Sequence, residues 1–381
     1  MRVAIVPFQF PVISETFVIN IATGLLDRGH DVEILPLFDS RKETGVVHPD
    51  VKKYDLLKRT HYPPHIVLKN KAVYMPMALR ELSFLTHKPY DIVHFQFGEA
   101  ALKCLPLRRS RILGGKWAVS FRGYDISSYV KEYGDNVYKT LFQEANLFLS
   151  NSDFFRRRLI NLGSDERRTF VYRSGIDCSK FAYFVKTFPK DKRVRIVTVG
   201  RLVEKKGIEY SVRAVAHLLK QGMDLEYDII GDGPLRNFLQ DLIDGFGARD
   251  RINLKGSQDQ KFIIEALQRS HIFITSSVTA KDGDQNGPDN TIKEAMAVGL
   301  PVIASRSGAI EEVVDDGKTG LLTDERDVEG IVQKIKHLTD HPEIWLAITK
   351  AARAFVEQNY NLDKLNDELV MRYKQVLGQE T

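Results

Sequence analysis

The chain opens with a short apolar run and then changes to a helical spacing. Residues 3–7 are almost entirely apolar, as in a buried strand, and residues 15–28 place apolar side chains on one helical face. Ser14 stands where a helix N-cap is expected, and Gly29 follows the expected end of the helix. Residues 32–37 predict a second strand. This strand–helix–strand opening is typical of a doubly wound sheet.

Two further strand-like segments in the first half end in polar residues. Residues 91–95 carry His94, and residues 116–121 are followed by Arg122. Ligands of open α/β sheets bind outside the carboxyl ends of the strands, so both side chains are candidates for a binding site. An alternative for His94 is a half-buried histidine whose hydrogen bonds are satisfied within the protein.

The same alternation starts again in the second half of the chain and continues to about residue 323. It predicts strands at 194–200, 226–230, 251–256, 271–277 and 302–304, with helices at 207–221 and 260–269. A helical tail follows over about 327–376. The segment 178–193, which contains Pro189, interrupts the pattern and is the expected linker. We therefore expect one α/β domain over 1–180, a second over 181–360, and a C-terminal helix over 361–381 that can pack back on the first domain.

The composition is that of an ordinary globular protein. A chain of 381 residues with 43% apolar residues can form two cores. No apolar run approaches the ~20 residues of a membrane span, and the first strand leaves no room for a signal peptide. Cys104 and Cys178 do not form a disulfide framework or a zinc motif. These features predict a cytoplasmic protein.

Charge is distributed unevenly between the two halves. Residues 1–185 hold 27 Lys and Arg against 19 Asp and Glu, an excess of +8, whereas the remainder holds 28 against 31, or −3. A basic half suits an anionic partner such as a phospholipid surface, a lipid diphosphate or a nucleic acid, although it can also serve solubility alone. Residues 41–80 interleave basic and apolar side chains, which fits either a membrane-surface helix or an ordinary surface helix pair. The basic residues of that segment include Lys52, Lys53, Lys58, Arg59, Lys69 and Lys71.

Two loops in the second half carry candidate chemistry. Arg201 and Lys206 flank a loop between a strand end and a helix N-terminus, where a bound anion would meet both charges and the helix dipole. Two solvated surface charges are the alternative. Residues 282–290 form a polar loop before a helix that begins at about Thr291, and Glu294 lies in its first turn. That acid could bind a ligand, or it could complete a capping box with Thr291.

The segment Glu294-Ala-Met-Ala-Val-Gly-Leu-Pro-Val resembles the signature of glycosyltransferase family 4. Members of this family are retaining sugar-nucleotide transferases with the GT-B fold, in which two Rossmann-like domains face each other across a cleft. The pairs Gly200-Arg201 and Lys206-Gly207 and the segment Gly231-Asp-Gly-Pro234 match further family elements, the last of which could also be only a turn. Ser14-Glu-Thr-Phe-Val is similar to members that build exopolysaccharides.

The resemblance implies a role for each matched residue. Arg201 and Lys206 would hold the donor diphosphate, Glu294 would hold the ribose hydroxyls, and His94 matches a family position. The implied catalytic set is Arg201, Lys206, Asn286, Glu294 and His94. The residues implied to contact the nucleotide sugar are Gly200, Gly231, Gly233, Gly287, Pro288, Asp289, Asn290, Thr291 and Arg122. Because side chains supply the positive charge, neither a metal ion nor a cofactor is expected.

Two positions depart from the family pattern. Asn286 stands where the family has the first glutamate of its pair, and Arg122 stands where many relatives have histidine. An amide keeps an acceptor oxygen for sugar hydroxyls but cannot act as a base or nucleophile. The chain could therefore be an active natural variant, an enzyme that relies on another acid, or a weakened enzyme. We favour an active enzyme, in which a glutamate introduced at position 286 would preserve or raise transfer.

The sequence thus predicts a cytoplasmic, membrane-associated, retaining glycosyltransferase. It would move a sugar from a UDP- or GDP-sugar to a saccharide acceptor, such as a lipid-linked oligosaccharide, in the synthesis of an exopolysaccharide or surface glycan. No nucleic acid partner is expected. The first alternative is a non-catalytic subunit that binds sugar nucleotides in a transferase complex. The second is another GT-B reaction, such as that of a phosphorylase or an epimerase.

Overall fold

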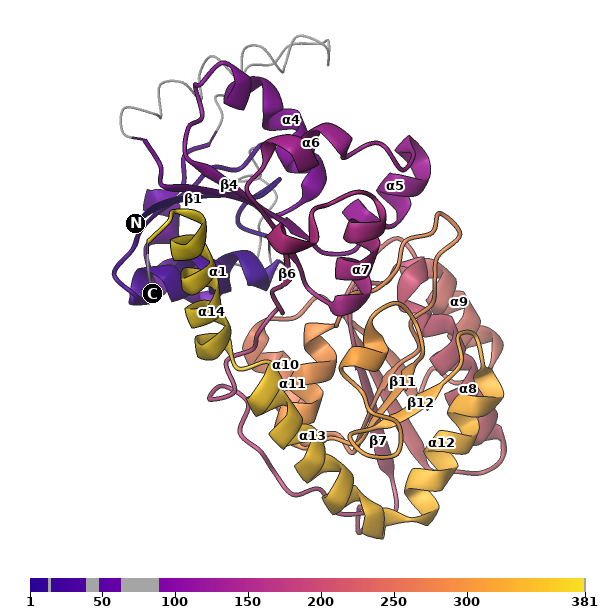
Figure 1. Cartoon of the computed structure of the whole chain (residues 1–381). Helices are drawn as coiled ribbons and strands as arrows, with labels where there is room; N and C mark the ends of the chain where they lie inside the picture. The colour runs from indigo at the N-terminus through magenta and orange to yellow at the C-terminus, as the bar shows by residue number, and fades with distance from the viewer. Residues whose placement is uncertain (13–14, 39–47, 63–88, 380–381) are drawn as a thin grey trace. The chain divides into compact units, whose positions relative to one another are not determined.

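The computed structural model describes residues 1–12, 15–38, 48–62 and 89–379. The chain forms two compact units, shown in Figure 1. The N-terminal unit comprises Met1–Gly175 together with Leu362–Thr381, and the C-terminal unit comprises Ile176–Asn361. The chain therefore passes between the units twice, and its last helix belongs to the unit in which the chain began.

The N-terminal unit is built on a parallel sheet with the strand order β2-β1-β3-β4-β5-β6. Its strands are β1 (Arg2–Val6), β2 (Asp31–Ile34), β3 (Ile92–Phe95), β4 (Lys116–Phe121), β5 (Leu147–Ser150) and β6 (Thr169–Val171). His94 of β3 pairs in register with Ile5 of β1 and Ala118 of β4. The ring of His94 therefore comes from the middle of the sheet.

Helices pack on this sheet and bury its apolar side chains. They are α1 (Thr16–Asp27), α2 (Pro49–Lys53), α4 (Gly98–Arg109), α5 (Ser128–Tyr133), α6 (Lys139–Glu144), α7 (Asp153–Asn161) and α14 (Leu362–Val376), with short 3-10 segments η1 (Leu56–Arg59), η4 (Tyr124–Ile126) and η5 (Glu166–Arg168). Figure 1 shows α14 beside α1, where Leu365, Leu369 and Tyr373 join the core formed by α1 and β1.

The C-terminal unit has a second parallel sheet, with the strand order β12-β11-β10-β7-β8-β9. Its strands are β7 (Val194–Val199), β8 (Leu225–Ile230), β9 (Ile252–Gly256), β10 (Ile272–Thr275), β11 (Val302–Ser305) and β12 (Leu321–Thr323). Strand order reverses between β7 and β10, so this is the switch point at which open α/β sheets bind ligands.

Nine helical segments surround this sheet in the described part of the C-terminal unit. They are η6 (Glu204–Lys206), α8 (Ile208–Lys220), α9 (Arg236–Gly245), α10 (Gln260–Arg269), α11 (Asn290–Val298), η7 (Ile310–Glu312), α12 (Val328–Asp340), η8 (Pro342–Ile344) and α13 (Trp345–Asn359). The helix α11 ends at Gly299, which adopts the left-handed conformation of a C-cap. Its buried residues Ile292, Ala295 and Met296 fix it against the sheet.

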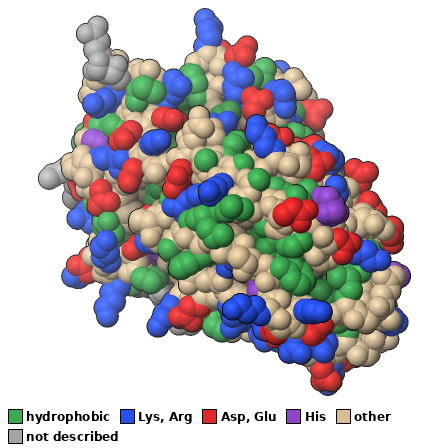
Figure 2. Space-filling model, turned by 90° about the horizontal axis from the view of Figure 1, so that it is seen from below, with side chains coloured by type: hydrophobic (Ala, Val, Ile, Leu, Met, Phe, Trp, Pro, Cys, Tyr) green, Lys and Arg blue, Asp and Glu red, His purple; other side chains and the backbone are tan. Residues whose placement is uncertain are grey.

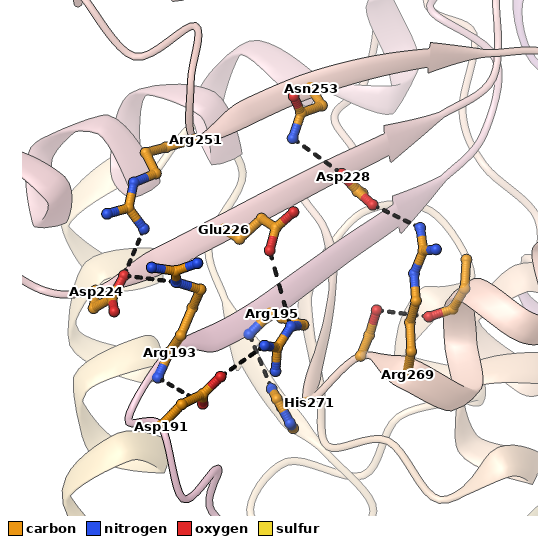
Figure 3. Close-up of polar contacts among 12 residues, drawn as sticks. Asp191, Arg193, Arg195, Asp224, Glu226, Asp228, Arg251, Asn253, Arg269 and His271 are labelled. Atoms are coloured by element: carbon orange, nitrogen blue, oxygen red, sulfur yellow. Dashed lines mark hydrogen bonds and ion pairs between the residues drawn. The ribbon is translucent and has the colours of Figure 1, made fainter.

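A network of charged side chains lies at the amino ends of β7, β8 and β9, away from the switch point (Figure 3). Asp224 accepts hydrogen bonds from Arg193 and Arg251 at 3.1 and 2.5 Å. Asp228 accepts one from Arg269 at 2.9 Å. Because most of these side chains are partly exposed, each pair contributes little to stability on its own.

The doubly wound α/β architecture predicted for both halves is confirmed. The helix α4 was not predicted, because its buried residues include the small Ala100 and Ala101, which give no marked apolar stripe, and because Pro106 lies inside it. The N-cap predicted at Ser14 and most of the basic segment 41–80 lie outside the described residues. Over the described parts of the chain, every helix is too short or too polar to span a bilayer.

Candidate functional site

Two loops at the carboxyl edge of the C-terminal sheet pack closely on each other. The loop after β7 begins at Gly200, whose N–H donates to Ile230 O at 2.9 Å. The loop after β8 contains Gly231, where a side-chain Cβ would lie only 1.9 Å from Gly200 O. Leu202 N then donates to Asp232 O at 2.9 Å. The glycine at 231 thus allows the two backbones to meet, which sets the path of the loop that carries Arg201 and Lys206.

The end of that loop is fixed against β10. Gly207 adopts a left-handed conformation with φ of 56°, and a Cβ there would lie 1.9 Å from Ser276 O. The Ser276 hydroxyl donates to Gly207 O at 2.7 Å. The first turn of α8 is therefore held at the switch point between β7 and β10.

Lys206 forms an ion pair with the loop that precedes α11. Its Nζ lies 2.6 Å from Asp289 Oδ2, and the two side chains are only 14% and 15% exposed. Burial lowers the pKa of Lys206, and the Asp289 carboxylate opposes that effect. Arg201 is exposed, and no residue in the described ranges pairs with its side chain. Of the two predicted phosphate-binding cations, one is therefore paired and partly buried, and the other is open to solvent.

Asp289 is also the N-cap of α11, but its side chain makes no capping hydrogen bond. The carboxylate points to Lys206 instead, so the N-cap side chain does not take up the first N–H groups of α11. The helix begins at Asn290, so Thr291 is already helical and Glu294 lies in the second turn. The capping box considered from the sequence is therefore wrong. The dipole and N–H groups of a helix N-terminus favour an anion.

Glu294 is a largely buried acid in α11. Burial raises its pKa to about 7, although the neighbouring Lys293 opposes that shift. Lys293 is itself buried, and its Nζ donates to Asn290 Oδ1 at 2.8 Å. No described side chain donates a hydrogen bond to the Glu294 carboxylate. Its two oxygens can therefore accept hydrogen bonds from ligand hydroxyls.

Asn286 is buried, with 2% of its surface exposed. Its side-chain Nδ2 donates to Lys205 O at 2.9 Å, and its main-chain oxygen accepts from Ala309 N at 3.0 Å. Lys205 is held in turn by Asp284, whose Oδ2 lies 2.7 Å from its Nζ. The amide thus ties the loop before α11 to the loop after β7, a structural function that the sequence did not indicate.

This contact changes the expected result of restoring the family residue. In Asn286→Glu, the N–H donor is lost and a carboxylate faces the Lys205 carbonyl inside the protein. We expect the free energy of unfolding to fall by about 1–3 kcal/mol and transfer not to rise, contrary to the expectation from sequence. Denaturant unfolding measures the first effect, with Asn237→Glu on the exposed face of α9 as the control. A variant as stable as wild type with faster transfer would contradict this prediction.

His94 in the N-terminal unit is fully buried. Its Nε2 lies 2.7 Å from Ser120 Oγ, and its Nδ1 lies 2.7 Å from the Tyr373 hydroxyl of α14. Burial lowers its pKa to about 3, and the charge on Arg122 adds to this effect, so the ring is neutral at physiological pH. Both nitrogens are satisfied, as in the alternative considered above, and the ring is more deeply buried than that alternative supposed. Its catalytic role stays a prediction.

Arg122 lies at the carboxyl edge of the same sheet. Its guanidinium donates to Gln96 Oε1 at 2.8 Å and to Ser174 Oγ at 3.1 Å, and it stacks on the Phe17 ring at 3.8 Å. Burial lowers its pKa to about 10, so it stays charged. The three contacts come from three different segments of the N-terminal unit, and together they hold the guanidinium in one orientation.

Asp125 organises the turn that presents Arg122. It is fully buried, and its carboxylate accepts hydrogen bonds from the main-chain N–H groups of Gly98, Arg122 and Gly123 at 3.0, 2.9 and 3.1 Å. These bonds join the loops after β3 and β4. Asp125 was not among the predicted site residues, although the spacing Arg122-Gly-x-Asp125 directly after a strand was a usable signal.

The structure therefore groups the predicted residues by unit. In the C-terminal unit, the Lys206–Asp289 pair, the Asn286 loop and the N-terminus of α11 adjoin the loop after β7. Gly200, Gly231 and Gly233 line the neighbouring loop contact, where a Cβ on Gly233 would lie 2.6 Å from Leu202 O. His94 and Arg122 lie together in the N-terminal unit.

Comparison with known proteins agrees with this arrangement. Residues 14–180 match the family model described as Glycosyltransferase Family 4, and residues 179–358 match that of glycosyl transferases group 1. The chain is 30% identical to the putative colanic acid biosynthesis glycosyltransferase WcaL of Salmonella typhimurium, over 97% of this chain and 98% of that protein. It is 31% identical to the amylovoran biosynthesis glycosyltransferase AmsK of Erwinia amylovora, over 95% and 96%.

Solved structures share the fold. The Anabaena protein HepE, crystallised in complex with UDP-glucose, superposes with a TM-score of 0.78 at 17% identity and covers 98% of this chain and 100% of its own. Sucrose-phosphate synthase from Thermosynechococcus elongatus gives a TM-score of 0.80 at 17% identity, with 99% of each chain covered. The predicted GT-B fold class is confirmed, and the chain belongs to glycosyltransferase family 4.

Proposed function

We propose that this glycosyltransferase is a retaining enzyme that moves a sugar from a nucleoside diphosphate sugar to a saccharide acceptor in exopolysaccharide assembly. The observation that carries the proposal is the Lys206–Asp289 pair beside the N-terminus of α11, with the Glu294 carboxylate one turn further along. This set combines donors for a diphosphate with an acceptor for ribose hydroxyls. The acceptor pathway is inferred from the colanic acid and amylovoran enzymes.

Each side chain has a separate task in this proposal. Lys206 and Arg201 stabilise the negative charge that develops on the leaving diphosphate, and the first N–H groups of α11 add the helix dipole. Glu294 accepts hydrogen bonds from two ribose hydroxyls. The backbone of residues 287–291 and the Oδ1 atom of Asn286 contact the transferred sugar. Because Asn286 is uncharged, catalysis depends on the leaving group rather than on a carboxylate nucleophile at that position.

The full chain, assayed against a panel of UDP- and GDP-sugars, tests this function. We expect one nucleotide sugar to be hydrolysed slowly in the absence of acceptor and to be used faster in its presence. The alternative is a non-catalytic subunit that binds sugar nucleotides, and it is favoured by the structural use of the Asn286 amide. Binding of a donor without any turnover, with acceptor extracts present, would support that subunit instead.

Transfer is expected to persist in EDTA. The positive charge at the leaving diphosphate comes from Lys206 and Arg201, so no divalent ion is needed to neutralise it. Initial rates measured with and without 5 mM EDTA, at about the same ionic strength, should agree within about twofold. A rate that disappears in EDTA and returns with added Mn²⁺ or Mg²⁺ would overturn this part of the mechanism.

We further infer that the acceptor is carried on a lipid and that the basic N-terminal unit docks on an anionic membrane. In the described part of the segment, Lys58 is paired with Asp55 at 2.9 Å and Arg59 with Asp31 at 3.7 Å. Lys52 and Lys53 are exposed on α2. On the face drawn in Figure 2, basic and acidic side chains are interspersed. Docking would rely on local basic groups such as the two exposed lysines of α2.

Charge reversal of these two lysines should weaken vesicle binding. For Lys52→Glu/Lys53→Glu we expect lower affinity for vesicles that contain anionic lipid, and a smaller loss of binding when salt shortens the Debye length to ~8 Å. Vesicle co-sedimentation measures both effects. Lys190→Glu/Lys192→Glu, which reverses two exposed lysines of the C-terminal unit, is the matched control. Equal binding of wild type to neutral and anionic vesicles would contradict the docking proposal.

A further inference from the structure

The guanidinium of Arg122 is a partly buried cation that no carboxylate of the described residues pairs with directly. Within the described residues its hydrogen-bond partners are the neutral Gln96 and Ser174, and no acidic group lies within ion-pair distance. Asp125 acts on it electrostatically, but that carboxylate is taken up by three main-chain N–H groups. Glu15 also acts on it, beyond ion-pair distance. Burying a charge in this way is costly unless a counter-charge arrives.

The guanidinium also has unused donors. Of its five N–H groups, one donates to Gln96 and one to Ser174. The Nε atom is buried and makes no hydrogen bond in the described structure. An unpaired buried donor commonly marks the place of a missing water or ion. Nε–H together with one terminal N–H forms the fork that binds a carboxylate or phosphate through two oxygens.

A second unpaired atom lies beside it. Asn151, which follows β5, donates through Nδ2 to Arg122 O at 2.8 Å, while its Oδ1 is buried and without a partner. The carboxyl edge of this sheet therefore holds an unused cationic donor and an unused neutral acceptor on adjacent strands. An acidic group on a sugar, next to a ring hydroxyl, offers the complementary pair.

The family resemblance implies that Arg122 contacts the nucleotide sugar. We propose instead that it binds an oxyanion of the acceptor, either the carboxylate of an acidic sugar or a phosphate of a lipid diphosphate carrier. Asn151 Oδ1 accepts a hydroxyl of the same molecule. The ring of Phe17 stacks on the guanidinium and Gln96 accepts a hydrogen bond from it. These two contacts fix the orientation of the guanidinium. The inference rests on the proposed function, since it names the class of acceptor. The arginine then selects acceptors by charge.

Binding to the full chain, saturated with UDP to occupy the donor site, tests this proposal. The probes are two matched pairs: methyl glucuronide against methyl glucoside, and geranyl diphosphate against geraniol. Ligand-observed NMR titration gives each dissociation constant. We expect wild type to bind at least one anionic member about 10- to 100-fold more tightly than its neutral counterpart. A preference in the first pair assigns an acidic sugar, and a preference in the second assigns the lipid diphosphate.

Variants separate recognition from a structural role. Arg122→Gln and Arg122→His should lose the anionic preference, whereas Arg122→Lys, which keeps the charge but not the fork, should retain part of it. Arg109→Gln, at an exposed arginine paired with Glu144, should keep it in full. Thermal unfolding confirms that each variant is folded. If Arg122 only ties the loops together, the variants lose stability and the anionic-to-neutral ratio stays that of wild type.

The two proposals can fail separately. Absence of any anionic preference in wild type, or an unchanged ratio in a folded Arg122→Gln, overturns the role of Arg122 even if sugar transfer is observed. Failure to bind UDP or to turn over any donor overturns the proposed function instead. In that case the ratio of the dissociation constants of the neutral and anionic probes can still be measured for each pair in the absence of nucleotide.

Discussion

Replacing Lys206 with alanine is expected to lower the rate of sugar transfer by about 10²- to 10³-fold. The ammonium group is partly buried beside the N-terminus of α11, so little water screens its effect on a leaving diphosphate. Its loss also leaves the Asp289 carboxylate, now without its partner, next to the bound anion. Initial rates at saturating donor measure the effect, which should appear in kcat because charge develops in the transition state.

The ion pair itself supplies the control. Since Asp289 makes no capping hydrogen bond, Asp289→Ala removes little besides the pair. We expect the double variant Lys206→Ala/Asp289→Ala to be faster than Lys206→Ala alone, because the unpaired negative charge has been removed. Lys318→Ala, at a lysine 73% exposed, should match wild type. Turnover of Lys206→Ala within a few-fold of wild type would show that the diphosphate binds elsewhere.

Replacing Glu294 with glutamine is expected to stabilise the nucleotide-free protein while weakening nucleotide binding. Burial raises the pKa of this acid from 4.5 to about 7, so the folded state holds the proton more tightly than the unfolded state does. The contribution of this tighter proton binding to the free energy of unfolding is complete below pH 4.5 and is lost as the pH rises through 7. The glutamine variant does not undergo this loss. Its stability advantage should grow between pH 4.5 and 7 and reach about 1–3 kcal/mol at pH 8.

The effect on ligand binding has the opposite sign. Glutamine offers one acceptor oxygen and no charge, so it cannot accept two ribose hydroxyls as a carboxylate does. We expect UDP or GDP affinity to fall about 10- to 100-fold. In wild type, the affinity should also decrease as the pH falls below about 7, because protonation of Glu294 removes the charged acceptor.

Urea unfolding and nucleotide titration at pH 5 and pH 8 measure the two effects. Glu265→Gln, at an exposed acid of α10, is the control for both. A glutamine variant that binds nucleotide as tightly as wild type would place the ribose elsewhere, whatever its stability. A variant that is destabilised at pH 8 would instead show that the carboxylate has a structural partner when ionised.

Much of the fold could be predicted because it depends on local patterns. The apolar runs at 194–200 and 302–304 and the helical spacing of 207–221 correspond to β7, β11 and α8. The helix α4 could not be predicted in this way, because small buried residues leave no stripe of large apolar side chains. Local pattern therefore identified elements whose burial shows in residue size, and missed one whose burial does not.

In the candidate site, too, local features were predicted and contacts between distant parts of the chain were not. The loop that carries Arg201 and Lys206 was located from its place between a strand and a helix and from its resemblance to a family motif. The structure shows close backbone contacts at Gly231 and Gly207 that fix this loop. The partners of Lys206 and His94 were not predicted. Asp289 lies 83 positions from Lys206, and Tyr373 lies 279 positions from His94. Such pairs depend on how segments that are distant in the sequence meet in the folded protein. Patterns within a single sequence do not specify those contacts.

The return of α14 to the N-terminal unit has a consequence for synthesis on the ribosome. Leu365, Leu369 and Tyr373 complete the core around α1, and Tyr373 supplies the hydroxyl next to His94 Nδ1. All residues of the C-terminal unit are translated before this helix is. The second unit can thus fold while the first still lacks its last helix, which reverses the usual order in which N-terminal domains finish first. A nascent chain arrested near residue 361 would hold an incomplete N-terminal core with an exposed apolar face, a form suited to capture by chaperones.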